Sequence, residues 1–237
     1  MAASNWTIIG NNPLAETLRS GARYIDAATP ITIATEPGDV PSDTFVLGPA
    51  AIHSQTGRVV PFYAAFEAVD EIAKELRAGT VGRIYGCYVS LRVPRGVAGE
   101  DLIYSAVIPS LALALDLLPG NPTRVWAKQA SLMTDDDAWF ITIRFDDEVI
   151  ATIEAMATTD ATPERELLVE MTGSDRVLRA EPTRQSVVVE RVGTGPVVAP
   201  WWEDLGERYL QLLTRRAGEP GRDSASRLRT VWNAVLD

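Results

Sequence analysis

Hydrophobic residues in the first quarter of the chain form short apolar stretches separated by turn residues. These stretches cover residues 5–10, 30–35 and 43–47, and apolar residues at helical spacing lie between the first two. Short apolar stretches bounded by Gly, Pro and Asn are typical of strands. The pattern predicts a small β-α-β-β segment.

From residue 62 the apolar residues recur every three or four positions. This spacing predicts an amphipathic helix over 62–78, closed by Gly79. Alternation over 83–93 predicts a strand. The apolar run 102–118 predicts a buried helix, because it is shorter than the roughly 18 residues that a membrane span needs.

The rest of the chain predicts a sheet followed by two helices. The alternating stretches are 124–132, 138–145, 148–157, 166–171, 177–180 and 186–192. Short turns between them favour antiparallel pairing. Apolar stripes starting at Trp202 and Leu228 predict the two helices. We therefore expect an α+β fold, in which a large, mostly antiparallel open sheet flanked by helices follows a reduced α/β segment.

Composition narrows the classes of function. The chain has 237 residues, 46% hydrophobic and 23% charged, which fits one large domain and a fragment at about 150 residues per domain. Its formal charge of −10 disfavours nucleic acid and anionic membranes as partners. The first residues lack a signal-peptide pattern, so we expect a cytoplasmic protein. The single Cys87 cannot form an internal disulfide.

Several short motifs occur in a consistent order in the last three quarters of the chain. Residues 58–61 read R-V-V-P before the amphipathic helix, and 76–84 read L-R-A-G-T-V-G-R-I at its end. Residues 171–178 place a turn between two strands. Residues 218–220 read G-E-P before the last helix. Together they resemble the Gfo/Idh/MocA family of nicotinamide-dependent sugar oxidoreductases.

The resemblance implies two domains. Residues 1–57 would be a truncated Rossmann-like segment, and 58–237 an α+β domain for substrate binding and oligomerisation. Residues 43–53 resemble the family's D-x-V-[VI]-[VI]-x-[TS]-P-x-x-x-H, which ends a Rossmann strand near the nicotinamide, with His53 at its last position. In the family the open face of the sheet mediates oligomers, so we expect a homodimer through that face.

Three family motifs are altered in this chain. The turn after the first strand keeps only Gly10 of the glycine fingerprint, and Pro13 removes a backbone donor. Residues 35–37 read T-E-P, without the lysine of the family's E-K-P. The proton-transfer motif D-x-G-x-H-x-x-D falls on 106–113, where Ser110 takes the histidine position. We therefore expect no cofactor, with NAD(P) as the alternative.

The start of the apolar helix offers the candidate catalytic residues. The resemblance places it at the substrate cleft, where Asp101 and Tyr104 would serve as acid, base or hydrogen-bond donor. Ser105 and Ser110 are candidate substrate-binding residues. The alternative is that Asp101 caps the helix while Tyr104 and Ser110 pack.

Four further residues are candidates for binding substrate. Arg92 and Arg95 end a strand near the same cleft and would hold a carboxylate in a forked geometry. His53 is the one side chain that ordinarily titrates near neutrality. Trp201 lies off the apolar stripe of its helix and would line a pocket or an interface. Solvated arginines and packing aromatics are the alternatives.

No metal site is expected, because one histidine and one cysteine lie far apart, and the aspartates at 135–137 form a solvated charge run.

The leading hypothesis is a small-molecule enzyme without ordinary NAD(P) hydride transfer, catalysing a redox-neutral step such as cyclisation, isomerisation or elimination. One alternative is a reduced NAD(P)-dependent oxidoreductase acting on a sugar-like or hydroxy/keto substrate. The other is a non-catalytic subunit that pairs with a full-length paralogue. Alternating Val125, Ala127, Ile141 and Ile143 predict an apolar open face that would favour self-association.

Overall fold

The chain forms two compact units, which are described separately. The computed structural model describes residues 5–11, 13–22, 27, 30–41, 43–53, 56–132, 137–158, 165–182, 189–191, 194–197, 205–217 and 224–236. The first unit comprises Met1–Ala65 and Trp202–Thr230, and the second Phe66–Trp201 and Val231–Asp237. The first break lies eight residues after the predicted boundary at 57, and the segment from Trp202 groups with the first unit.

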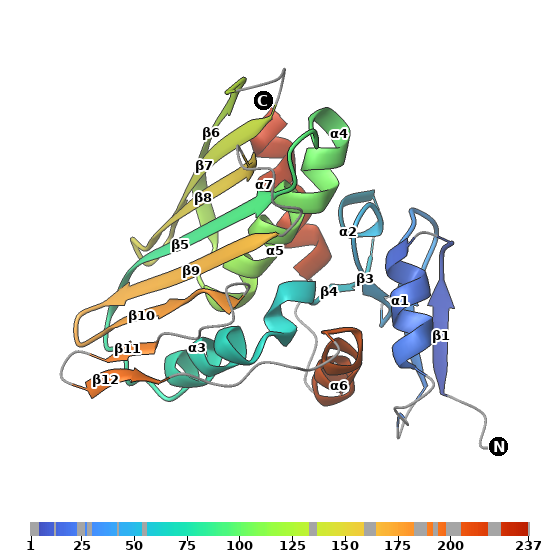
Figure 1. Ribbon diagram of the computed structural model, residues 1–237, viewed down its shortest axis with the longest axis horizontal. Coiled ribbons are helices and arrows are strands. Elements are labelled where there is room, and N and C mark those ends of the chain that lie inside the picture. Colours follow the sequence, from blue (N-terminus) through green and yellow to red (C-terminus); the bar gives the residue numbers. More distant parts are fainter. Residues whose placement is uncertain are drawn as a thin grey trace. The chain divides into compact units, whose positions relative to one another are not determined.

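The first unit contains a parallel sheet in the order β1-β2-β3-β4, of which Figure 1 labels β1, β3 and β4. Its strands are β1 (Trp6–Ile9), β2 (Ile31–Ala34), β3 (Phe45–Val46) and β4 (Arg58–Val59). Helix α1 (Pro13–Gly21) connects β1 to β2, and α2 (Ala50–His53) lies between β3 and β4. The strands predicted in the first quarter are confirmed. Within the described residues, β1 forms one edge of this sheet.

Side chains from the C-terminal part of the first unit satisfy the backbone of β4 and the residue after it. Helix α6 (Leu205–Ala217) contacts α1 and the 3₁₀ turn η1 (Phe62–Ala65). The Tyr209 hydroxyl donates to the Val60 carbonyl at 2.7 Å. At the start of α7 (Ser224–Leu236), Ser224 Oγ accepts from the Val59 N–H at 2.7 Å and donates to the Val59 carbonyl at 3.1 Å.

The second unit is built on a six-stranded sheet in the order β10-β9-β5-β8-β7-β6. The strands are β5 (Ile84–Val93), β6 (Pro122–Ala130), β7 (Ala138–Phe145), β8 (Ile150–Ala157), β9 (Glu166–Gly173) and β10 (Val177–Ala180). Among the described strands of this sheet, β5 and β8 alone pair in parallel, which confirms the predicted, mostly antiparallel sheet. A separate hairpin of β11 (Val189–Arg191) and β12 (Thr194–Val197) lies within the predicted stretch 186–192 and beyond it.

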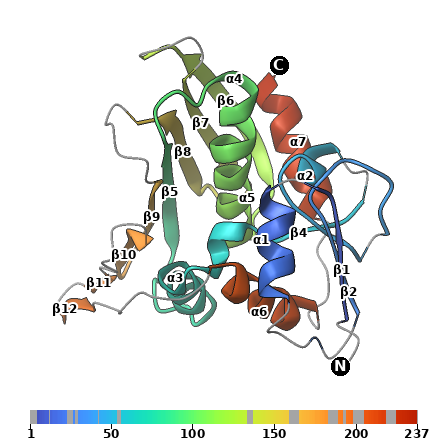
Figure 2. The ribbon, with the colours of Figure 1, turned by 45° about the vertical axis from the view of Figure 1, so that its right-hand side comes forward.

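Helices cover one face of this sheet. Figure 2 shows α4 (Gly99–Leu102) and α5 (Ile108–Leu117) lying across it, and α5 contacts β5 and β8. The amphipathic helix α3 (Glu67–Arg77) contacts β10. Near the end of α7, the ring of Trp232 lies 6.1 Å from that of Trp139 in β7. None of the described helices has the length and apolarity to cross a membrane.

The predicted apolar open face is wrong. Val125 pairs with Ile143 and Ala127 with Ile141, so the four residues do share a face. However, Ile141 and Ile143 are 1% and 0% exposed and belong to the face that packs against the helices. Alternation separates the two faces of a strand, but it does not say which one the helices cover.

The predicted apolar helix is confirmed and contains one irregular turn. Residues Ile103–Val107 (η2) form a π turn between α4 and α5, and the N–H of Ile108 bonds to the carbonyl of Ile103. Pro109 follows directly and supplies no N–H, so the regular ladder is interrupted here.

Candidate functional site

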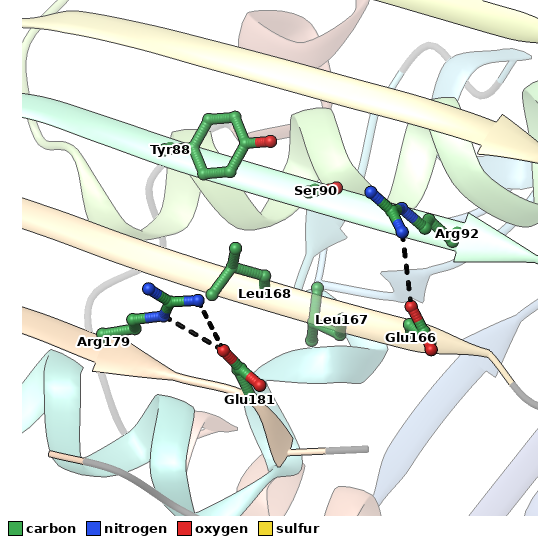
Figure 3. A pocket seen from close by; sticks show the side chains of 8 residues that line it. All are labelled: Tyr88, Ser90, Arg92, Glu166, Leu167, Leu168, Arg179 and Glu181. Atoms are coloured by element: carbon green, nitrogen blue, oxygen red, sulfur yellow. Dashed lines mark hydrogen bonds and ion pairs between the residues drawn. The ribbon is translucent and has the colours of Figure 1, made fainter. Parts of the chain in front are cut away.

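A shallow pocket of about 180 Å³ opens on the face of the six-stranded sheet that the described helices leave uncovered (Figure 3). It lies over β5, β9 and the end of β10. The residues that line it are Tyr88, Ser90, Arg92, Glu166, Leu167, Leu168, Arg179 and Glu181. Most of them are polar or charged, so this pocket is suited to a polar ligand.

The register of the strands brings these side chains together. Tyr88, Ser90 and Arg92 alternate along β5 and therefore point to the same face. Ser90 pairs with Leu168 and Arg92 with Glu166 on the neighbouring strand. The pocket is therefore built across strands far apart in sequence.

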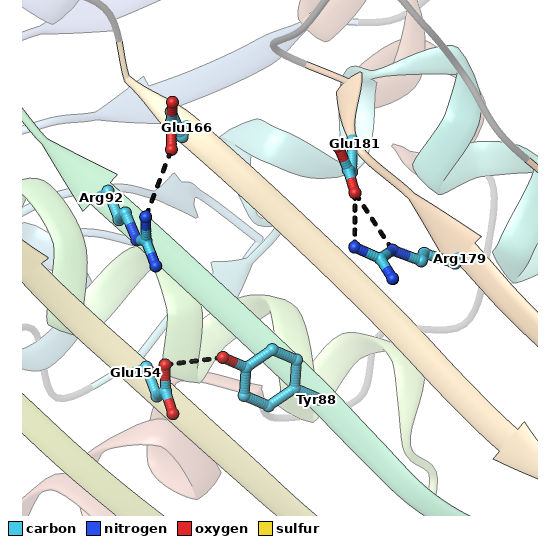
Figure 4. Close-up of polar contacts among 6 residues, drawn as sticks. All are labelled: Tyr88, Arg92, Glu154, Glu166, Arg179 and Glu181. Atoms are coloured by element: carbon cyan, nitrogen blue, oxygen red, sulfur yellow. Dashed lines mark hydrogen bonds and ion pairs between the residues drawn. The ribbon is translucent and has the colours of Figure 1, made fainter.

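Tyr88 and Glu154 form a short polar contact beside the pocket. The Tyr88 hydroxyl donates to Glu154 Oε2 at 2.6 Å from the adjacent strand β8 (Figure 4). Burial and then this hydrogen bond raise the pKa of Tyr88 above its ordinary value. The phenol therefore keeps its proton at neutral pH and points it at a carboxylate.

Two arginine–glutamate pairs differ in how completely the guanidinium is engaged. Arg179 donates through Nε and a terminal nitrogen to Glu181 Oε1, at 3.1 and 2.6 Å. Arg92 lies 3.7 Å from Glu166 Oε2, which is an ion pair but too long for a hydrogen bond. The lining carries two guanidiniums and two carboxylates, so its formal charge is balanced.

The predicted catalytic residues lie on the other side of the sheet. Asp101 is in α4, Tyr104 and Ser105 are in η2, and Ser110 is in α5, all on the helix that packs against the covered face. Arg92 is on the open face. The structure brings Arg92 together with Tyr88 and Ser90, and not with Asp101 and Tyr104.

The environments of these helix residues differ. Burial and then a hydrogen bond to Glu100 raise the pKa of Tyr104 above its ordinary value. Asp101 is exposed and is not the helix cap, because Ala98 holds that position. The hydroxyls of Ser105 and Ser110 are buried without a hydrogen-bond partner in the described structure, and Ser110 is 0% exposed. Ser110 therefore packs in the core.

The remaining predicted site residues lie neither in the open-face pocket nor at the start of the apolar helix. Arg95 is exposed in the loop after β5, and His53 is exposed at the end of α2 in the first unit. Trp201 lies outside the described residues.

Of the acidic run 135–137 only Asp137 is described. It is 1% exposed and accepts from the Leu132 N–H at 2.6 Å, so the solvated reading is wrong for it. The described residues contain no cluster of three His, Cys, Asp or Glu that could hold a metal.

The sequence contained a partial signal for the pocket. Tyr88, Ser90 and Arg92 alternate within the predicted strand 83–93, which marks a polar face. The sequence did not identify Glu154 and Arg179 as their neighbours. Strand order and register decide which residues of different strands lie next to each other, and a local pattern contains neither.

The turn between β1 and α1 is closed by side chains of its own unit. Gly10 has φ +123°, a conformation that favours glycine. The Asn11 N–H donates to Glu36 Oε1 at 2.8 Å, and the Thr35 N–H to the Ile9 carbonyl at 3.0 Å. The Arg19 guanidinium donates to the carbonyls of Ile8 and Gly10. The hydrogen bonds of Thr35 and Glu36 therefore hold the end of β2 against this turn.

The comparisons with known proteins give structural matches only. No protein-family model and no curated protein sequence matches the chain. An inositol dehydrogenase homologue from Azotobacter vinelandii, complexed with NADH and myo-inositol, is similar with TM-score 0.70 at 12% identity over 98% of this chain and 94% of that one. An NAD-binding oxidoreductase from Klebsiella pneumoniae has TM-score 0.71 at 11% identity over 99% and 97%.

A third match points the same way. The UDP-N-acetylglucosamine 3-dehydrogenase from Acidithiobacillus ferrooxidans has TM-score 0.67 at 12% identity over 98% of this chain and 95% of that one. The chain has the Gfo/Idh/MocA fold. The fold predicted from the sequence is confirmed, with parallel strands first and a large open sheet after them.

The Gfo/Idh/MocA fold implies a nicotinamide dinucleotide, and the turn after β1 tests whether it fits. In a dinucleotide-binding Rossmann sheet the backbone N–H groups of this turn and of the next helix face the pyrophosphate. Here the Asn11 N–H faces the Glu36 carboxylate, and α1 begins with Pro13, which has no N–H. Glu36 itself follows β2, which is where such a sheet ordinarily carries the acid that binds the ribose, so the fit is decided by the turn. With Gly10 as its one glycine and Pro13 at the start of α1, this turn does not fit a pyrophosphate bound in the usual way.

Proposed function

We propose that the chain is a small-molecule enzyme of Gfo/Idh/MocA fold that works without a nicotinamide cofactor and catalyses a redox-neutral step. Cyclisation, isomerisation and elimination are steps of this class. The observation that carries the proposal is the turn after β1, where the Asn11 N–H is already bonded to Glu36 and α1 begins with Pro13, which has no N–H.

Strand order in the first unit supports a shortened nucleotide-binding domain. In the usual dinucleotide-binding sheet the order is 3-2-1-4-5-6, so the first strand is central and one mononucleotide-binding half lies on each side of it. Here β1 is at an edge within the described residues. We infer that residues 1–57 are a truncated Rossmann segment that retains strands from one side of β1.

The start of the apolar helix supplies groups for proton transfer. Tyr104 is protonated at neutral pH, as tyrosines ordinarily are, and its raised pKa holds the proton more firmly, so its hydroxyl is available as a hydrogen-bond donor. Asp101 is exposed and precedes Tyr104 by three positions, which puts the two side chains on neighbouring positions of the helix surface. A donor and a carboxylate base side by side suit a step that moves a proton without a hydride.

One alternative has a specific observation in its favour. The Azotobacter vinelandii structure is a complex with NADH and myo-inositol. A reduced NAD(P)-dependent oxidoreductase acting on a sugar-like or hydroxy/keto substrate is therefore the second candidate. Pairing with a second copy or with a paralogous subunit through the open sheet stays a prediction.

A mass-balance experiment tests the function. The chain is incubated with a mixture of small metabolites with and without added NAD(P), and the products are followed by mass spectrometry. We expect isomers, or products that have lost water, without any nucleotide. The same conversion should be lost with Tyr104→Phe, which removes the donated proton and keeps the ring.

Three results would contradict the proposal. The first is a product that differs from its precursor by two hydrogens and appears only with NAD(P). The second is full activity of the Tyr104→Phe variant. The third is the absence of any conversion, which would favour a non-catalytic subunit. Asn233→Ala, an exposed change in α7, is the matched control and should convert as the wild type does.

A further inference from the structure

Strand β1 has the composition of a central strand but lies at the edge of its described sheet. Its four residues read W-T-I-I, without a charge, a glycine or a proline. In the usual dinucleotide-binding sheet the first strand is paired on both sides. Here β2 pairs with one side of β1, and the described residues supply no strand for the other. An uncharged apolar edge strand is the kind that pairs with a strand of another chain.

The hydrogen bonds to β2 identify the backbone groups that face this free edge of β1. The Asn5 carbonyl accepts from the Ile31 N–H at 2.8 Å. The Ile9 carbonyl accepts from the Thr35 N–H at 3.0 Å. In a parallel pair, alternate residues of a strand direct their N–H and their carbonyl to the same neighbour. The backbone groups of Ile8 therefore point away from β2, toward the free edge.

A side chain of α1 covers this edge. The Arg19 guanidinium donates to the Ile8 carbonyl at 3.2 Å, and it also donates to the Gly10 carbonyl. A hydrogen bond from a charged donor is about twice as strong as a bond between two neutral backbone groups. A strand that pairs with β1 at this edge would therefore have to displace the guanidinium and would gain weaker bonds.

The edge would otherwise favour association. Ile9 is 43% exposed, so β1 presents an apolar side chain next to the backbone groups of its edge. The strand that is always present at equal concentration and has the same β-forming composition is β1 of a second copy. We propose that Arg19 blocks the edge of β1 from pairing with β1 of a second copy of this chain. This proposal does not rest on the proposed function, because it concerns association and not the chemistry at Tyr104.

Cross-linking at Thr7 tests the proposal. Thr7 is exposed on β1, and the single native cysteine, Cys87, is buried, so Thr7→Cys supplies the accessible thiol. The full chain with Thr7→Cys is treated with a short bis-maleimide, with and without Arg19→Ala, and the covalent dimer is quantified on a denaturing gel. We expect about tenfold or more covalent dimer with Arg19→Ala, because pairing no longer breaks hydrogen bonds from a charged donor. The sedimentation coefficient should also rise more steeply with protein concentration.

Three further variants separate edge pairing from other effects. Arg215→Ala is the matched control, because it removes an exposed arginine from α6 in the same unit, and it should cross-link as Thr7→Cys alone does. Ile9→Lys, added to Arg19→Ala, places a charge on the edge strand and should return the covalent dimer to the level of Thr7→Cys alone. Arg19→Lys should give an intermediate level, because lysine keeps the charge and loses the fork.

The other outcomes overturn the proposal. Unchanged cross-linking in Arg19→Ala, with circular dichroism showing that it is folded, would mean that Arg19 does not block the edge. Abundant dimer in Thr7→Cys alone would mean that a second copy pairs at β1 in spite of Arg19. An equal rise in Arg215→Ala would indicate a general effect of charge, and a rise that Ile9→Lys does not reverse would place the association elsewhere. If Arg19→Ala does not fold, Arg19→Lys must itself raise the covalent dimer, and an unchanged level would refute the proposal.

Discussion

Among single residues, Cys87 and Tyr88 show that adjacent residues of one strand lie on opposite faces of the sheet. It is 3% exposed on the covered face of β5, while its neighbour Tyr88 points into the open pocket. Burial raises the pKa of Cys87 to about 12. The thiolate is the reactive form of cysteine, so Cys87 is inert in the folded protein and serves the core.

This shift predicts how stability depends on pH. The folded pKa lies above the unfolded value, so the contribution of Cys87 is complete below the unfolded pKa and is lost as pH rises toward about 12. The free energy of unfolding should fall by up to about 1.4 kcal/mol per pH unit there. Urea unfolding of the wild type and of Cys87→Ala, at pH values from about 8 to about 11, measures this change in the free energy of unfolding. A difference between the two that stays constant with pH would contradict the assignment.

At the level of elements, the end of β4 depends on helices that come much later in the chain. Val59 is 8% exposed, and its N–H and carbonyl both bond to Ser224 Oγ at the start of α7. Removing that hydroxyl leaves a buried donor without its acceptor, a loss that is costly in a protein interior. The first unit therefore needs residues from both ends of the sequence.

Ser224→Ala should lower the free energy of unfolding by about 1–3 kcal/mol. Asn233→Ala on the exposed side of the same helix is the control and should change it little, because helix propensity favours alanine. Urea denaturation measures both. Equal stability of Ser224→Ala and wild type would show that water replaces the hydroxyl at β4.

Element types followed from the sequence better than element partners did. The strands predicted at 138–145 and 177–180 have the observed bounds, because alternation is a local property. The covered face was misjudged at Ile141 and Ile143, and the role of Ser224 was missed. Both depend on which distant element packs where, and no local period contains that information.

On the scale of the whole molecule, the candidate sites also show that a local sequence pattern does not identify contacts between distant residues. The family resemblance predicted that Arg92 and Tyr104 lie at one cleft, whereas they lie on opposite faces of the sheet. Glu154 lies 66 positions from Tyr88, and Glu36 lies 25 from Asn11, yet each pair is hydrogen-bonded. The sequence predicted the loss of the glycine fingerprint but not the hydrogen bond from the Asn11 N–H to the Glu36 carboxylate.

That carboxylate leads to the most decisive test of the two candidate functions. A ligand that binds only the folded state stabilises it by RT ln(1 + [L]/Kd), about 2.7 kcal/mol at a hundred times Kd. We expect NAD(H) and NADP(H) to leave the thermal midpoint of the wild type unchanged. Glu36→Gln removes the negative charge and keeps a hydrogen-bond acceptor for the Asn11 N–H, so it should fold normally. The nucleotides should leave the thermal midpoint of this variant unchanged as well, because Pro13 still has no N–H to donate and β1 still lies at the edge of the described sheet. Saturable stabilisation of the wild type would establish the oxidoreductase alternative, and a response of Glu36→Gln alone would mean that one side chain excludes the dinucleotide.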